Sequence, residues 1–230
     1  MAATDTFERE LTAAAQREMC ENPFIAALTE GRASRDAIRR YTAGLYALSD
    51  RLPQRLLRIA AMIDDRKVRL ALLENLLEEE GVIAIDGGHL VADDRKRHPN
   101  LARRLAHAAG ATDDDLRDAS AAAEAQATWL NDAIAKGRIA AALAYLTVGI
   151  EGNVPATMEL VVDALASHYA FHERELEFLT SHIELDAGHA AAGARLVARI
   201  ASTGADRADA IEGARRGGLA WYWWHRSFAD

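Results

Sequence analysis

No stretch of this chain alternates polar and apolar residues over the length of a β-strand, and that absence restricts the fold more than any other feature. Half of the 230 residues are hydrophobic, yet Ala is abundant while Val and Ile are sparse. Such a composition favours helix nearly everywhere. No linker or internal repeat divides the chain. We therefore predict an all-α protein with a single helical domain over residues 1–230.

Residues that start or stop helices divide the chain into predicted segments. Ser34 is typical of an N-cap, and Pro53 should kink the long helix that follows it. The glycines and charges between Gly81 and Arg97 indicate an irregular loop, which is long for a connection inside one domain. Besides the long helix after Ser34, the predicted helices cover about residues 5–19, 23–31, 64–81, 99–109, 112–136, 138–150, 167–200 and 205–228.

Charge and composition exclude several classes of function. The net charge of −8 and the pI near 5.5 argue against a nucleic-acid-binding surface, which needs clustered Lys and Arg. Cys20 is the one cysteine, so an intrachain disulfide is impossible and a reducing compartment fits. The sequence shows neither a signal peptide nor an apolar run long enough to span a membrane. We expect a soluble cytoplasmic protein that binds neither nucleic acid nor membrane.

The most informative motif is His182-x3-Asp186-x2-His189. On an α-helix, positions i, i+4 and i+7 lie on one face, so two imidazoles and a carboxylate would project together. This set suits Fe, Mn or Zn. The alternative is a solvated helix face with scattered histidines.

A second candidate is Glu151, which follows the mostly apolar run at residues 140–150. Pro155 removes the hydrogen bond to the carbonyl of residue 151 and should open the helix there. An acid at a break in an apolar helix is costly unless it is paired or coordinated. Glu151 is therefore predicted to be a metal ligand or a catalytic group.

Three consecutive glutamates, residues 78–80, end another predicted helix. The helix dipole is negative at that end, so a bound cation would remove an unfavourable interaction, although a solvated, frayed helix end is the alternative. Periodicity does not choose between Glu79 and Glu80. After the loop, His98 begins the next helix, and His89 lies within the loop. Either histidine could supply a further imidazole.

These residues resemble those of the haem-oxygenase-like diiron oxidases and oxygenases, a group that also includes TenA-type and PqqC-type proteins. The resemblance covers most of the chain. Residues 75–80 resemble the family's acidic helix end, residues 98–110 the next core helix, and residues 182–189 the last ligand motif. It implies a haem-oxygenase-like bundle of about seven to nine helices. It also implies six metal ligands: Glu79, His98, Glu151, His182, Asp186 and His189.

The loop between Glu79 and His98 is longer than is usual in the family, so the choices between Glu79 and Glu80 and between His98 and His89 stay open. By this resemblance, two iron ions cycling between Fe(II) and Fe(III) would use O2 as co-substrate to oxidise a small organic metabolite. No catalytic residue beyond the metal ligands and no organic cofactor is implied, and a homodimer is the expected assembly.

Two other functions are compatible with the same fold. One is a metal-independent, TenA- or PqqC-like enzyme of cofactor metabolism. A TenA-like hydrolase needs a nucleophilic cysteine in the core, and Cys20 lies too early in the chain to fill that role. The other is a non-catalytic helical binding protein.

Overall fold

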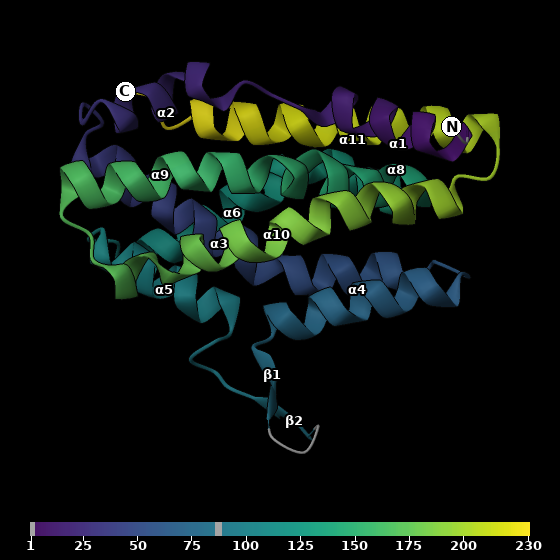
Figure 1. The fold of residues 1–230 in the computed structure, drawn as a ribbon. Helices are drawn as coiled ribbons and strands as arrows, with labels where there is room; N and C mark the ends of the chain where they lie inside the picture. Colours follow the sequence, from purple (N-terminus) through teal and green to yellow (C-terminus); the bar gives the residue numbers. More distant parts are fainter. Residues whose placement is uncertain (1–2, 86–88) are drawn as a thin grey trace. The chain divides into compact units, whose positions relative to one another are not determined.

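The computed structural model describes the backbone of residues 3–85 and 89–230, and the side chains within these ranges except those of residues 3–5, 84–85, 126 and 184–191. The described residues form eleven α-helices and one two-stranded sheet (Figure 1). The all-α prediction is therefore confirmed, although the helices outnumber the predicted seven to nine.

The chain divides into two compact units, which we describe separately. The terminal unit comprises residues 1–33, 126–171 and 179–230, and the middle unit comprises residues 34–125 and 172–178. That the chain is a single domain stays a prediction, because this division alone does not decide whether the two units fold separately.

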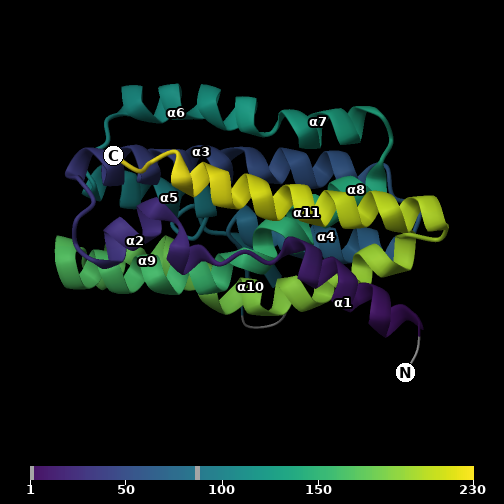
Figure 2. The same ribbon diagram turned by 90° about the horizontal axis from the view of Figure 1, so that it is seen from above.

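The middle unit is built around α3 (Arg35–Ala60), which contacts both α4 (Arg66–Glu79) and α5 (His98–Ala108). Figure 2 shows α6 (Asp113–Gln126) running beside α3. The side chain of Ser34 caps α3 by accepting a hydrogen bond of 3.1 Å from the Ala37 N–H, as predicted. The core includes the buried side chains of Ile38, Tyr41, Leu45, Leu56, Ile59, Val68, Leu72, Leu101 and Leu105.

The segment after α4 contains a β-hairpin, so the prediction of an irregular loop there was wrong. Strands β1 (Val82–Ile85) and β2 (His89–Ala92) pair antiparallel, with Val82 opposite Ala92 and Ile85 opposite His89. The strands read Val-Ile-Ala-Ile and His-Leu-Val-Ala, so neither shows the alternation of polar and apolar residues that predicts a strand from sequence. The hairpin lies between the end of α4 and the start of α5 (Figure 1).

In the terminal unit, α11 (Gly204–Arg226) packs against α1 (Ala3–Ala15), α8 (Ile139–Ala144) and the π-helix η2 (Tyr145–Ile150). Glycines let these backbones meet directly. A Cβ atom at Gly149 would lie 2.6 Å from the Cα atom of Gly217. Trp221 and Trp224 of α11 are buried and belong to the core. The remaining helices of the unit are α2 (Pro23–Thr29), α7 (Thr128–Ala135), α9 (Val154–Tyr169) and most of α10 (Glu173–Ile200).

Two predicted helices are each divided in the structure. The predicted helix at 167–200 is divided where Ala170 adopts a left-handed conformation with φ of 59°: its first residues end α9, and the rest is α10. Most of α9, which begins at Val154, was not predicted as a helix. The predicted helix at 112–136 is α6 and α7, separated at Ala127. Neither break contains a Gly or Pro that would signal it.

The helical stretch Ile139–Tyr169 is long and apolar enough to cross a membrane by length and composition alone. However, 67% of its apolar window is buried inside the protein. Such burial is what a core helix of this fold requires, because both sides of the stretch pack against other helices.

Candidate metal centre

Packing separates the two glutamates that the sequence left open. Glu79 continues the buried face of α4, on which Val68, Leu72 and Asn75 also lie, and only 5% of its surface is exposed. Glu80 turns away and accepts a hydrogen bond of 2.8 Å from Nε of Arg97. That ion pair is half-exposed, with 40% of the Glu80 side chain in contact with solvent. Only Glu79 is therefore held in the interior.

The hairpin joins the end of α4 to the start of α5 through a tightly closed backbone. Gly81 ends α4 with φ of 67°, and a Cβ atom there would lie 2.5 Å from the Arg97 backbone nitrogen. The Asp93 N–H donates a hydrogen bond of 2.9 Å to the Gly81 carbonyl. These contacts bring residues 97 and 98 back to the end of α4.

As a result, Glu79 and His98 form a buried pair. His98 opens α5, and its Nδ1 atom lies 3.0 Å from Oε1 of Glu79. His98 is 5% exposed, so the pair is shielded from solvent on both sides. Phe178, in the first turns of α10, places its ring edge-on to the His98 ring at a centroid distance of 6.3 Å. His89, in contrast, lies exposed on β2, outside this pair.

The start of α10 is attached to α5 and to the segment just before it by Arg104 and Lys96. Nε of Arg104 donates a hydrogen bond of 2.9 Å to the Arg174 carbonyl, and Nζ of Lys96 lies 2.8 Å from Oε1 of Glu177. The Lys96 hydrogen bond is the main reason why the pKa of Glu177 is held below its usual range. This attachment holds Phe178 against His98.

Glu151 lies at an irregular point in the terminal unit. The π-helix η2 ends at Ile150, and a 3-10 turn, η3 (Glu151–Asn153), leads into α9, where Pro155 occupies the first turn. The predicted opening of the helix at this proline is therefore present. Glu151 is 7% exposed. Buried Asn153 secures the turn, because its amide donates to the carbonyls of Gly149 at 2.7 Å and Ala15 at 3.1 Å.

The motif at residues 182–189 lies within α10, so its predicted helical conformation is confirmed. His182 is partly exposed. The side chains of Asp186 and His189 lie outside the described residues. His168 belongs to α9, and its Nε2 lies 3.1 Å from the Thr29 carbonyl.

The α10 face that carries the motif contacts the segment before Glu151. Gly193 follows positions 182, 186 and 189 at helical spacing, so all four positions share one face. A Cβ atom at Gly193 would lie 2.7 Å from the Cβ atom of Thr147, which precedes Glu151 by four residues. Both contacting segments belong to the terminal unit. Gly193 thus packs against the segment before Glu151 within that unit, while Glu79 and His98 are paired in the middle unit.

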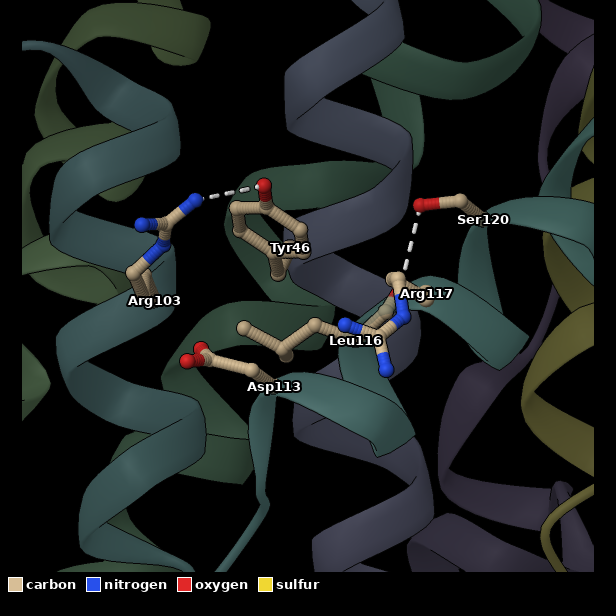
Figure 3. Close-up of a pocket in the computed structure, with 6 residues that line it drawn as sticks. All are labelled: Tyr46, Arg103, Asp113, Leu116, Arg117 and Ser120. Carbon is tan, nitrogen blue, oxygen red and sulfur yellow. Dashed lines mark hydrogen bonds between the residues drawn. The ribbon is translucent and has the colours of Figure 1, made fainter.

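A second feature of the middle unit is a cavity of about 250 Å³ on its surface (Figure 3). Its floor contains the buried side chains of Tyr46 and Leu116, and Arg103 donates a hydrogen bond of 2.9 Å to the Tyr46 hydroxyl. The other lining residues are Asp113, Arg117 and Ser120. None of the predicted metal ligands lines this cavity. Sequence reasoning missed it, because its residues come from three helices with no shared motif.

Comparison with known proteins identifies named relatives. A 4-aminobenzoate synthase of Nitrosomonas europaea is 26% identical over 227 residues, which cover 93% of this chain and 87% of that protein. A 4-aminobenzoate synthase of Chlamydia muridarum is 25% identical over 83% of this chain and 77% of its own length. A pyrroloquinoline-quinone synthase of Pseudomonas putida is 32% identical, but over only 36% of this chain and 33% of that protein.

Solved structures share the fold at lower sequence identity. A TenA homologue from Pseudomonas syringae pv. tomato matches with a TM-score of 0.76 and 15% identity, covering 97% of this chain and 91% of its own. A Shewanella denitrificans domain with a haem-oxygenase-like fold matches with a TM-score of 0.71 and 17% identity over 98% and 88% of the two chains. The sequence model of the family described as iron-containing redox enzyme matches residues 39–222. This chain therefore belongs to the haem-oxygenase-like family of iron-containing redox enzymes.

Proposed function

We propose that this protein is a non-haem iron oxidase or oxygenase that uses O2 to oxidise a small organic metabolite. Two irons would be held by Glu79, His98, Glu151, His182, Asp186 and His189. The observation that carries the proposal is the buried Glu79–His98 pair, in which a carboxylate and an imidazole from two helices lie 3.0 Å apart.

The chemistry of these donors fits iron. Carboxylates combined with imidazoles are ligands that non-haem Fe(II) accepts, and thiolates, which would favour other metals, are absent from the set. Glu79 and Glu151 are both less than a tenth exposed. Burying a carboxylate among apolar side chains is costly unless a cation or hydrogen bonds compensate for it, and a bound metal would provide that compensation.

His182 is the proposed third member of the Glu79–His98 group. It follows Phe178 by four residues, so the two share a face of α10, and Phe178 contacts the His98 ring. One carboxylate and two imidazoles make a group that could hold a metal ion. Glu151 and the positions of Asp186 and His189 supply the remaining donors of the proposal.

When bound, the iron would supply the electrons that reduce O2. The protein's own contribution is to hold the donors and exclude water. Phe178 packs its ring edge against one side of the His98 imidazole, while Nδ1 of His98 lies 3.0 Å from Oε1 of Glu79.

Iron loading tests this proposal, because matched controls lie next to the proposed ligands. The wild-type protein is loaded with Fe(II) without O2, and bound iron is counted after removal of excess metal. We expect about two irons per chain in the wild type and a clear loss in Glu79→Gln and His98→Ala. Glu80→Gln and His89→Ala make the same chemical changes outside the buried pair and should leave the iron content unchanged.

Exposure of the loaded protein to O2 should then produce a transient change in absorption that the depleted variants lack. No iron uptake by the wild type, or equal uptake by Glu79→Gln and Glu80→Gln, would contradict the proposal. Because relatives that match most of the chain are named 4-aminobenzoate synthases, 4-aminobenzoate is the first product to seek by mass spectrometry after O2 exposure.

A second candidate is a metal-independent activity like that of the other cofactor-forming enzymes of this fold. The partial match to a pyrroloquinoline-quinone synthase favours it. Cys20 does not supply a core nucleophile for a hydrolase, because it is exposed in the short 3-10 helix η1 (Met19–Glu21). An activity that persists after complete iron removal would select this second function over the first.

A further inference from the structure

Exposed apolar side chains are concentrated in one part of the middle unit. Among the described side chains, all but one of the large hydrophobic residues that are exposed fall between residues 57 and 91, and the exception is Trp223 of α11. Exposed apolar side chains gathered in one segment in this way are typical of an interface. The residues are Leu57, Met62, Leu70, Leu73, Leu77, Ile83, Leu90 and Val91.

Helix α4 is apolar on two opposite faces. Val68 and Leu72 face the core, whereas Leu70, Leu73 and Leu77 are 40%, 41% and 37% exposed. The exposed leucines are spaced by three and four residues, the spacing of the seam along which two helices pair. A helix that is apolar on both sides is normally covered on both sides.

The charges of α4 run against its own dipole. Arg66 and Lys67 lie in the first turn, where the dipole is positive, while Glu74 and Glu78 lie toward the negative end. Each placement is unfavourable for the isolated helix. A second helix lying antiparallel would bring acidic groups beside the basic end and basic groups beside the acidic end. A copy of α4 has this complementary order of charges.

We propose that α4 pairs antiparallel with α4 of a second copy of this chain about a two-fold axis. Leu70 packs against the partner's Leu73, and by symmetry Leu73 packs against the partner's Leu70. Lys67 then lies beside the partner's Glu74, because both positions flank the leucine seam. The pairing leaves Glu79 on the opposite, buried face of α4, so it does not require bound metal.

The same arrangement accounts for apolar groups beyond α4. Met62 precedes α4, while Ile83, Leu90 and Val91 belong to the hairpin that follows it. In an antiparallel pair, the beginning of one helix lies beside the end of the other. Met62 of one copy therefore comes near the hairpin of its partner, and the interface extends past the helix seam.

Sedimentation velocity on the full chain tests the proposal. We expect the wild type to be a dimer at micromolar concentration and Leu73→Glu to be a monomer there, because two carboxylates would enter the seam. Trp223→Glu is the matched control, since it replaces the exposed large hydrophobic side chain outside this region, and it should stay dimeric. Circular dichroism and thermal melting establish that Leu73→Glu is folded.

A charge reversal tests the direction of pairing with exposed residues whose substitution should not affect folding. Glu74→Lys places like charges beside each other twice per dimer, and we expect dimerisation about tenfold weaker or more at low salt. Combining it with Lys67→Glu restores opposite charges and should recover most of the wild-type affinity. High salt should reduce the difference between the single and double variants.

Three results would overturn the inference. The first is a wild-type protein that stays monomeric across the micromolar range. The second is a dimer that Leu73→Glu and Trp223→Glu leave equally stable. The third is a double charge variant that dimerises no better than Glu74→Lys, which would contradict the antiparallel register.

Discussion

Glu79 and Glu151 are buried to a similar degree, but they reach the interior by different routes. Glu79 completes the regular buried face of α4, and the hairpin then closes the chain back onto it. Glu151 lies where a π-helix and a 3-10 turn interrupt an apolar run. The first route depends on local closure around Gly81, and the second on neighbouring helices that hold an irregular backbone. Substitutions that disturb the surroundings of Glu79 and of Glu151 should therefore reduce folding stability by different amounts.

The largest loss of stability is expected where α11 packs against the irregular backbone that precedes Glu151. A Cβ atom at Gly217 would collide with the Tyr145 carbonyl of η2, and backbone atoms cannot move away as a flexible side chain can. Gly217→Val should therefore lower the free energy of unfolding by about 4 kcal/mol or more, measured by urea denaturation. Gly204→Ala is the control, because a Cβ atom there meets nothing within 4 Å. Equal stability of the two variants would disprove this account of the packing.

Disturbing the backbone closure around Gly81 should cause a smaller loss of stability, together with a specific loss of iron binding. Gly81→Ala adds both left-handed strain and a clash with the Arg97 backbone, which together should cost about 3 kcal/mol. Gly110→Ala at the end of α5 shares the positive φ but meets no atom within 4 Å, so it should cost only about 1 kcal/mol. Iron binding should fall in Gly81→Ala and persist in Gly110→Ala. Iron binding retained by both would show that hairpin closure does not position the pair.

A pH dependence should arise in the terminal unit from His225. Burial lowers the pKa of this histidine from its ordinary value of 6.5 to about 3, against the opposing effect of its hydrogen bond to the Trp221 carbonyl. Between these pH values only the unfolded chain gains the proton, so stability falls as the pH falls below 6.5. At pH 5 the loss from this group should be about 2 kcal/mol relative to pH 7.5.

His225→Leu removes that titration, and the comparison with wild type isolates it from the many carboxylates. Urea denaturation at several pH values should give a flatter profile for the variant. Parallel profiles for the two proteins would mean that His225 is accessible to protons in the folded state.

The smallest effect tests whether the Glu80–Arg97 ion pair contributes to hairpin closure. Both side chains are about a third or more exposed, and exposed pairs contribute little. Arg97→Gln should therefore cost about 0.5 kcal/mol in thermal or urea unfolding. A loss as large as that of Gly81→Ala would show that the ion pair, rather than the backbone, closes the hairpin.

Helix boundaries could be predicted where local chemistry determines them. Ser34 caps its helix through its own side chain, Pro23 begins α2, and the positive φ of Gly31 follows the end of that helix. The break near Pro155 follows from the hydrogen bond that proline cannot donate. In each case the physical cause lies within a few residues of the boundary, so the sequence alone contains it.

Other boundaries depend on distant contacts. The chain leaves α9 at Ala170, a residue with no preference for a left-handed conformation, and the Tyr169 hydroxyl donates a hydrogen bond of 3.1 Å to the distant Ala33 carbonyl. Helical periodicity continues across such a break, which is why residues 167–200 were predicted as one helix. The break at Ala127 lacks a local signal in the same way.

The candidate site was predictable in its residue types but not in its pairing. Periodicity placed Glu79 and Glu80 on two apolar faces of α4, because leucines occupy both. Packing against the rest of the middle unit buries one of these faces, and no local rule identifies which. The hairpin register then determines that His98, rather than His89, lies against Glu79.

The π-helix η2 also determines in which direction around the helix axis the following residues point. A π turn holds one more residue than an α-helical turn, so its backbone is equivalent to a one-residue insertion. Deleting a residue from Tyr145–Ile150 would let α8 continue as a regular helix and would rotate Glu151 by about 100° around the axis. The number of residues between α8 and Glu151 is therefore constrained, and not only their type. A homologue with one residue fewer here would place a different side chain at the buried position that Glu151 occupies.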